Sequence, residues 1–315
     1  MRRSIRSCRS CWLVFGLLVV GPSVVEGQRP PIDDRSVFRS GIELVYVTAT
    51  VVDANGRLVD GLTQDDFEIY EDRDLQPVTY FSTERVPLSL GLVLDISDSM
   101  YGTRIDDARA ALDRFLLDLL EPTDEAFLLV FNHEPTLTAE WALRPSRLSP
   151  YLDDVRPYGG TAMYDAMLEA LPLFRGRRHQ RAAIVLVSDG ADTASDHPVR
   201  EVRQRLRSSD AFVYAIAIDA KESMPINDRV NLQALREMTD ESGGYTELVL
   251  DTADLAPAAR RIADELNQQY TLGYSPSKAP DGRYRRIRVR IADRDHRVRA
   301  RQGYVATPRD PRGPR

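Results

Sequence analysis

Three short segments of this 315-residue chain combine carboxylates and hydroxyls at spacings that suit a metal ion. In the first, Asp95, Ser97 and Ser99 stand at alternate positions, so a tight loop can turn their oxygens to one side. The other two are Gly159-Gly160-Thr161 and Ser188-Asp189-Gly190. Together they supply two carboxylates and three hydroxyls, an all-oxygen donor set of the kind that Mg²⁺ prefers.

Each segment has an ordinary structural explanation when it is taken alone. Asp and Ser favour helix caps and turns, Ser-Asp-Gly is typical of a turn, and Gly-Gly-Thr before a helix is typical of an N-cap or an anion site. Their combination after successive strands is what predicts metal binding. The predicted ligands are Asp95, Ser97, Ser99, Thr161 and Asp189. Hydroxyls are neutral donors, so they would leave the ion electrophilic and open to an incoming carboxylate.

Alternating strands and helices are predicted between residues 86 and 270, and they would position these segments. Strands are expected at Leu88–Asp95, Ala126–Phe131, Ala182–Val187, Phe212–Ile218 and Tyr245–Val249, and helices at Asp106–Leu120, Ala162–Phe174, Pro198–Leu206, Val230–Thr239 and Leu255–Gln269. This order predicts a doubly wound α/β fold with a mainly parallel sheet. Ligands bind such sheets at the carboxyl ends of the strands, where the three segments are expected.

Further β segments are predicted on both sides of the α/β region, at residues 41–85 and 271–306. Val45, Val47, Ala49 and Val51 alternate with more polar residues, as in a strand with one buried face. A two-stranded hairpin is marginally stable by itself. We therefore expect the N- and C-terminal strands to form one small β-sandwich into which the α/β region is inserted. Two separate β appendages are the alternative.

The N-terminus has the pattern of an export signal at residues 1–27. Four arginines precede the apolar run Cys11–Val20, and Pro22 ends it. This run is shorter than the ~20 residues of a membrane span, so we expect no span after signal cleavage and a periplasmic or secreted protein. An uncleaved N-terminal membrane anchor is the alternative. Residues 28–40 are predicted to be a linker and residues 307–315 a disordered tail. Both cysteines lie in the signal, so no disulfide is expected.

The charge of the chain argues against nucleic-acid binding. Removing residues 1–27, which hold four Arg and one Glu, leaves 38 basic and 47 acidic residues and a net charge of −9. Nine arginines nevertheless lie between Arg283 and Arg301. They suggest either a polyanion-binding patch or the solvated face of an edge hairpin, where charge discourages aggregation, and we favour the hairpin.

The segments DISDS, GGT and SDG, in this order, resemble the metal-ion-dependent adhesion site of the von Willebrand factor type A domain family, over about residues 86–270. The flanking segments GLTQDDFEIYED, YTLGYSP and RARQGYV are similar to a bacterial exported group of these domains. The resemblance implies that Ser97, Ser99 and Thr161 bind the metal through hydroxyls, and that Asp95 and Asp189 bind it directly or through water. Mg²⁺ is the expected ion, with Mn²⁺ or Ca²⁺ as alternatives.

One position departs from the family pattern, because Asp98 stands where many members have Gly. Its carboxylate would either tighten cation binding or discourage an acidic partner. The resemblance also implies that the last helix, Leu255–Gln269, shifts when the ion is engaged.

The predicted function is non-enzymatic: divalent-cation-dependent binding of a protein partner that presents an Asp or Glu, in adhesion or assembly at the cell envelope or exterior. Residues expected to contact the partner are Asp98, Tyr101, Arg104, Tyr158 and Asp192. A structural scaffold whose metal site only stabilises loops, or is degenerate, is the first alternative. A metal-dependent phosphatase or hydrolase is a weaker one, because Ser97 occupies the place of a second catalytic Asp and no G-x-S-x-G or P-loop motif is present.

Overall fold

The computed structural model describes residues 44–189, 191–218, 231–291 and 295–308. All of them belong to one compact unit, Ile42–Arg315. The predicted export signal (1–27) and linker (28–40) lie outside the described residues, as do Gly190 and residues 309–315 of the predicted tail. Within the described ranges, no helix combines the length and the apolar character needed to cross a membrane.

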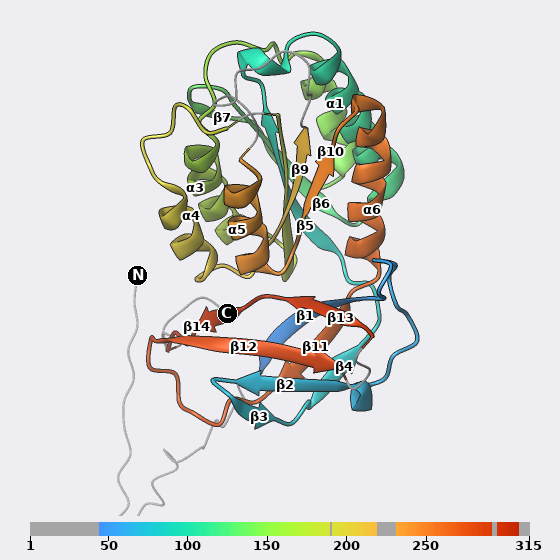
Figure 1. The fold of residues 1–315 in the computed structure, drawn as a ribbon, viewed down its shortest axis with the longest axis vertical. Coiled ribbons are helices and arrows are strands. Elements are labelled where there is room, and N and C mark those ends of the chain that lie inside the picture. The colour runs from blue at the N-terminus through green and yellow to red at the C-terminus, as the bar shows by residue number, and fades with distance from the viewer. Residues whose placement is uncertain (1–43, 190, 219–230, 292–294, 309–315) are drawn as a thin grey trace, which may run out of the picture. The chain divides into compact units, whose positions relative to one another are not determined.

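A six-stranded sheet forms the centre of the α/β region, in the strand order β10-β9-β8-β5-β6-β7 (Figure 1). Its strands are β5 (Leu88–Asp95), β6 (Glu125–Phe131), β7 (Pro135–Ala142), β8 (Arg181–Ser188), β9 (Phe212–Ile218) and β10 (Thr246–Val249). Only β7 pairs in the antiparallel sense. Every residue of β5 and β6 is buried, as expected for parallel strands that are covered on both faces.

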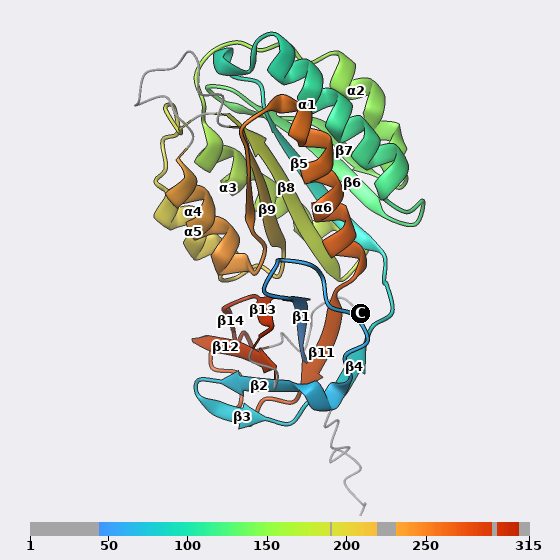
Figure 2. The same cartoon turned by 45° about the vertical axis from the view of Figure 1, so that its right-hand side comes forward.

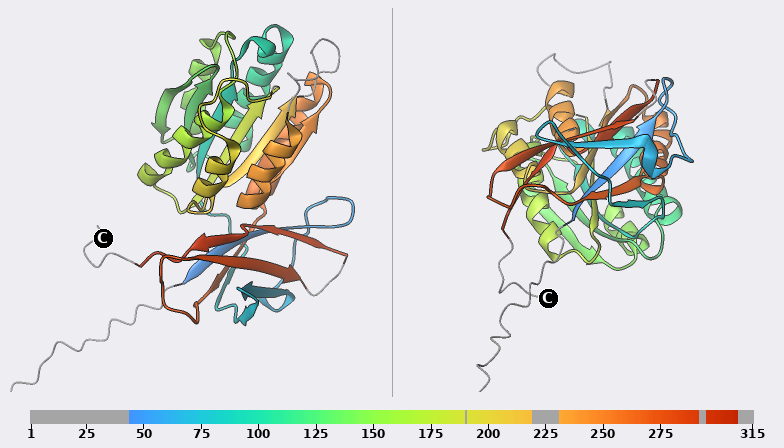
Figure 3. Two further views of the ribbon diagram at one scale, coloured as in Figure 1. Left: turned by 60° about the vertical axis from the view of Figure 1, so that its left-hand side comes forward. Right: turned by 90° about the horizontal axis from the view of Figure 1, so that it is seen from below.

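Helices cover both faces of this sheet, so the predicted doubly wound α/β fold is confirmed. Helices α1 (Thr103–Arg114) and α6 (Leu255–Asn267) share one apolar core with the even-numbered leucines of β5. On the other face, Val93 shares a core with α3 (Met163–Leu173), α4 (Val199–Leu206) and α5 (Leu232–Ser242) (Figure 3). Shorter helical segments are η1 (Gln64–Asp66), η2 (Asp98–Met100), η3 (Phe115–Leu119), η4 (Pro145–Leu148), α2 (Ser149–Asp153), η5 (Phe174–Gly176) and η7 (Thr252–Asp254).

The remaining strands form two four-stranded antiparallel sheets, β13-β1-β11-β4 and β14-β12-β2-β3 (Figure 2). Their bounds are β1 (Val45–Val52), β2 (Phe67–Glu71), β3 (Asp74–Gln76), β4 (Tyr80–Ser82), β11 (Tyr270–Tyr274), β12 (Tyr284–Ile291), β13 (Arg297–Ala300) and β14 (Gly303–Val305). Both sheets contain strands from each end of the chain, and both contribute to one apolar core. The prediction of a single sandwich is therefore confirmed, and the alternative of two separate appendages is wrong.

A buried carboxylate on α6 connects the helix with the sandwich. Glu265 accepts hydrogen bonds from Thr50 Oγ1 of β1 at 3.0 Å and from Tyr214 OH of β9 at 3.1 Å. Arg299 of β13 also donates to it and forms an ion pair. These contacts hold the carboxyl end of α6 against two sandwich strands.

Several elements differ from the sequence-based expectations. Helix α1 begins at Thr103 and gives way at Phe115 to a π-helical turn, and strand β7 was not expected at all. Strand β12 carries much of the arginine-rich segment, and it pairs with β2 on one side and β14 on the other. The next arginine-rich strand, β13, pairs with β1 in the other sheet, so the two strands do not form the expected edge hairpin.

Gly91 in β5 leaves space for an aromatic ring on the neighbouring strand. A Cβ atom at Gly91 would lie 2.5 Å from Cζ of Phe127. That ring is fully buried and packs edge-on against Trp141 and Phe174, so it has little room to move. We predict that Gly91→Ala lowers the free energy of unfolding by about 1–3 kcal/mol, measured by urea denaturation.

Gly176→Ala is the matched control, because the nearest atom to a Cβ there is 3.8 Å away. We expect this variant to stay within about 0.5 kcal/mol of the parent protein. Equal stabilities of the two variants would contradict the packing argument.

Candidate metal centre

The candidate site lies where the strand order of the parallel sheet reverses. Strand β5 is flanked by β6, which follows it in the chain, and by β8, which comes later. The carboxyl ends of β5 and β8 lie side by side, with Asp95 ending one strand and Ser188 the other. Such a reversal is where doubly wound sheets bind ligands.

The Asp95 carboxylate is fully buried and is held by both strand ends. Its Oδ1 accepts a hydrogen bond from the backbone N–H of Ser97 at 2.8 Å, and its Oδ2 accepts one from the Ser188 hydroxyl at 2.5 Å. Burial raises the pKa of Asp95 to about 7; the bonds from Ser188 and Ser97 oppose this rise, and the nearby Asp189 carboxylate adds to it.

Hydroxyl groups continue the cluster from Ser97 to Asp189. The Oγ atoms of Ser97 and Ser99 lie 2.9 Å apart, and Ser99 Oγ donates to Asp189 Oδ1 at 2.6 Å. Arg104 Nη1 lies 3.1 Å from Asp189 Oδ2 and also donates to the Ser99 carbonyl at 2.5 Å. Burial raises the pKa of Asp189, although Ser99 and Arg104 stabilise its charged form.

The loop that carries Thr161 is hydrogen-bonded along the first segment. The N–H of Tyr158 donates to the Ile96 carbonyl at 2.9 Å, and the N–H of Asp98 donates to the Gly159 carbonyl at 2.9 Å. Thr161 is buried, and its N–H donates to Thr193 Oγ1 at 3.0 Å. Thr161 therefore lies between the loop after β5 and the loop after β8.

The structure thus brings together the residues predicted as ligands. One hydrogen-bonded network joins four of them, Asp95, Ser97, Ser99 and Asp189, to Ser188. Thr161, the fifth, lies in a loop that is hydrogen-bonded to the main chain of the segment after β5. Asp95 and Asp189 are buried carboxylates, and Arg104 pairs with Asp189 alone. The remaining donors are hydroxyls, so the side-chain chemistry fits a hard divalent cation. In the described part of the chain, no three His, Cys, Asp or Glu side chains gather as a metal cluster, so hydroxyls would have to complete this donor set.

The five residues expected to contact a partner fall into two groups. Asp98, Tyr101 and Tyr158 are exposed around the cluster, and the tyrosines are 79% and 53% accessible. Arg104 is instead bound to Asp189, and Asp192 caps α3 by accepting hydrogen bonds from Tyr164 N at 2.9 Å and Ser195 Oγ at 2.6 Å.

One member of the network was not among the predicted site residues. The Ser188 hydroxyl binds Asp95 directly, and its place beside Asp189 in the Ser-Asp-Gly segment was the available signal.

The family model of the von Willebrand factor type A domain matches residues 90–191, from β5 to the loop after β8. This chain carries a von Willebrand factor type A domain. Human inter-alpha-trypsin inhibitor heavy chain H4 is 26% identical over 221 residues, which are 64% of this chain and 23% of the human protein. The corresponding pig heavy chain H4 is 28% identical over 195 residues, 57% of this chain and 20% of that protein.

A solved structure of a von Willebrand factor type A protein from Catenulispora acidiphila has a related fold. It superposes with a TM-score of 0.52 at 12% identity, and the match covers 84% of this chain and 73% of that one. The type A fold is therefore shared with that protein. The sequence match to the human heavy chain H4 spans only about a quarter of the length of that protein.

Gly159 is required by both the backbone and the space of the Thr161 loop. Its φ is +79°, and a Cβ there would lie 2.7 Å from Nδ1 of His133. Gly56 has almost the same φ, +78°, with nothing within 4 Å of its Cβ position. We predict that Gly56→Ala costs about 1 kcal/mol of unfolding free energy and Gly159→Ala at least about 1 kcal/mol more, measured by urea denaturation.

The difference between these two variants isolates the contact with His133. Equal losses would mean that the His133 side chain moves aside and that the loop does not depend on the close approach.

Proposed function

We propose that this protein binds a protein partner through a divalent cation held by Asp95, Ser97, Ser99, Thr161 and Asp189. When bound, the cation, Mg²⁺ with Mn²⁺ or Ca²⁺ as alternatives, would supply a Lewis-acidic centre for an Asp or Glu carboxylate of the partner. The observation that carries the proposal is the buried network of two carboxylates and three serine hydroxyls at the ends of β5 and β8. Ser188 and the N–H of Ser97 would hold Asp95 in place.

The surroundings of the network support recognition of a large partner. Asp98, Tyr101 and Tyr158 are exposed around it, and the Tyr158 ring rests edge-on against His133 at 5.7 Å. Exposed tyrosines supply apolar contact area and a hydroxyl, a combination common in protein interfaces. Asp98 would select against partners with additional acidic groups near the bound carboxylate.

A binding role is favoured over catalysis. Hydrolysis at a metal would need a general base beside the ion. The Asp192 carboxylate is already occupied by Tyr164 N and Ser195, and in the described residues no hydrogen bond orients the exposed Asp98 carboxylate as a base. The curated relatives are named as inter-alpha-trypsin inhibitor heavy chains, which also supports an interaction function. The signal-like N-terminus supports action in the periplasm or outside the cell.

Calorimetric titration of Mg²⁺ into the full chain tests the site. We predict saturable binding by the parent protein and at least about tenfold weaker binding by Asp95→Asn and Ser99→Ala, because each removes a hard oxygen donor. Asp154→Asn is the control, since Asp154 is exposed, outside the network, and loses the same charge. Thermal unfolding without metal verifies that each variant is folded.

Failure of Mg²⁺, Mn²⁺ and Ca²⁺ to bind the folded parent protein would contradict the proposal. If Asp95→Asn does not fold and none of the metal ions restores folding, the alternative of a structural scaffold with a degenerate site is favoured instead.

The carboxylate-binding step needs its own measurement. With Mn²⁺ as a paramagnetic ion, we expect acetate to lower the water-proton relaxation enhancement of the parent protein, because a carboxylate replaces bound water. Binding of Mn²⁺ without any response to acetate would support a purely structural ion.

A further inference from the structure

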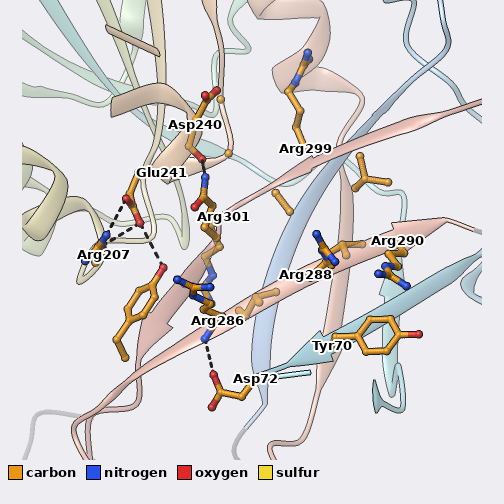
Figure 4. A pocket seen from close by; sticks show the side chains of 18 of the residues that line it. Tyr70, Asp72, Arg207, Asp240, Glu241, Arg286, Arg288, Arg290, Arg299 and Arg301 are labelled. Atoms are coloured by element: carbon orange, nitrogen blue, oxygen red, sulfur yellow. Dashed lines mark hydrogen bonds and ion pairs between the residues drawn. The ribbon is translucent and has the colours of Figure 1, made fainter. Parts of the chain in front are cut away.

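A cleft of about 1010 Å³ is lined by 19 residues, seven of which are arginines (Figure 4). None of the 19 belongs to the candidate metal centre. The arginines come from β12, β13 and the neighbouring α4 and β2–β3 segments, and they are Arg73, Arg207, Arg286, Arg288, Arg290, Arg299 and Arg301. The acidic residues of the lining are Asp72, Asp240 and Glu241. Arg299 is already paired with Glu265, so the other six arginines against three carboxylates leave a surplus of three positive charges, although the sequence as a whole is acidic.

A regular row of cations runs along β12 inside this cleft. Arg286, Arg288 and Arg290 are exposed and alternate with Ile287 and Val289, which pack into or against the sandwich core. Alternate residues of a strand lie about 7 Å apart on one face. Within the described residues, no carboxylate lies at ion-pair distance from these three guanidinium groups. The row is therefore open to an external anion.

Two of the three acidic residues in the cleft already have positive or donor partners. Glu241 is buried and accepts from Arg207 Nε at 3.1 Å, with Arg203 on its other side. Asp72 accepts from the backbone N–H of Arg286 at 3.0 Å and lies 3.6 Å from Lys278 Nζ. These carboxylates therefore do little to neutralise the row on β12.

One arginine at the rim occupies an unfavourable backbone conformation. Asp72 and Arg73 connect β2 to β3 with φ values of +50° and +87°, the positive-φ non-glycine residues found in the described ranges. A two-residue turn of this kind favours Asn-Gly or Asp-Gly. Arginine in place of glycine costs stability, and such strain is commonly retained at functional sites.

The shape of the cleft disfavours nucleic acids and extended peptides as ligands. Arg290 covers the ring of Tyr70 at 5.1 Å and Arg207 covers that of Tyr284 at 5.4 Å, so one face of each ring is already occupied and less open to stacking on a base. Strand β12 pairs with β14 over Tyr284–Arg286 and with β2 over Ile287–Ile291, so an added peptide strand would find only part of either edge open. We therefore expect recognition to rely on side chains.

We propose that this cleft binds a linear acidic polysaccharide, whose sulfate or carboxylate groups pair with Arg286, Arg288 and Arg290. The planar guanidinium fork matches the oxygens of either group. The exposed Asp240 and Gln302 at the same cleft would hydrogen-bond sugar hydroxyls. This binding does not involve the metal-site residues and is independent of the function proposed above.

Fluorescence anisotropy with labelled heparin and labelled polygalacturonate, added to the full chain at low ionic strength, tests the proposal. The variant Arg286→Gln/Arg288→Gln/Arg290→Gln removes the row. Three exposed charge contacts together are expected to account for roughly a tenfold loss of affinity. The matched control, Arg114→Gln/Arg144→Gln/Arg147→Gln, removes three exposed arginines outside the cleft and should bind as the parent protein does.

The two polysaccharides separate sulfate from carboxylate recognition, and tight binding of either supports the proposal. If both triple variants lose affinity equally, binding depends on overall charge and not on the row of arginines, which would overturn the proposal. Absence of binding to both polymers, or tighter binding of single-stranded DNA than of heparin, would also overturn it. Thermal unfolding establishes that both triple variants fold. The single variant Arg288→Glu provides a second test with a smaller change, and we expect it to lose affinity several-fold.

Discussion

Burial of the Asp95 carboxylate at the end of a buried strand is the constraint around which the type A domain is organised. A carboxylate out of water must be hydrogen-bonded or neutralised. Because β5 lies between β6 and β8, the partners of this carboxylate come from the loop after β5, through the N–H of Ser97, and from the last residue of β8, Ser188. The same segments bring Asp189 close. The candidate metal centre therefore lies at the point where the strand order reverses.

The sequence predicted the elements whose stability depends on local pattern, and it failed where distant pairing decides. The mostly apolar run Leu88–Asp95 is typical of a strand covered on both faces. Strand β7 went unseen, since Pro135–Ala142 is a mostly accessible edge strand without such a run. The arginines of β12 indicated an exposed face, but its partners β2 and β14 are not its neighbour β13, which pairs with β1, so the hairpin interpretation was wrong.

The candidate site shows the same division between local and distant information. Asp95, Ser97 and Ser99 could be recognised because their spacing lies within five residues. The pairing of Arg104 with Asp189 and the capping of α3 by Asp192 join residues far apart in the sequence, and both side chains had been expected to face a partner. A spacing motif identifies which residues can meet, whereas the fold decides which of them are already engaged.

The position of β1 has a consequence for the synthesis of the protein. Both neighbours of Val45–Val52 in its sheet, β11 and β13, come from the chain after residue 269. At roughly 5–20 residues per second, a ribosome needs about 10–40 s to reach them. The inserted α/β region can complete its own sheet within that interval, while β1 waits with both edges unpaired. Nascent chains of this protein are therefore vulnerable to pairing with one another through β1, and a chaperone that shields this strand would raise the yield of folded protein.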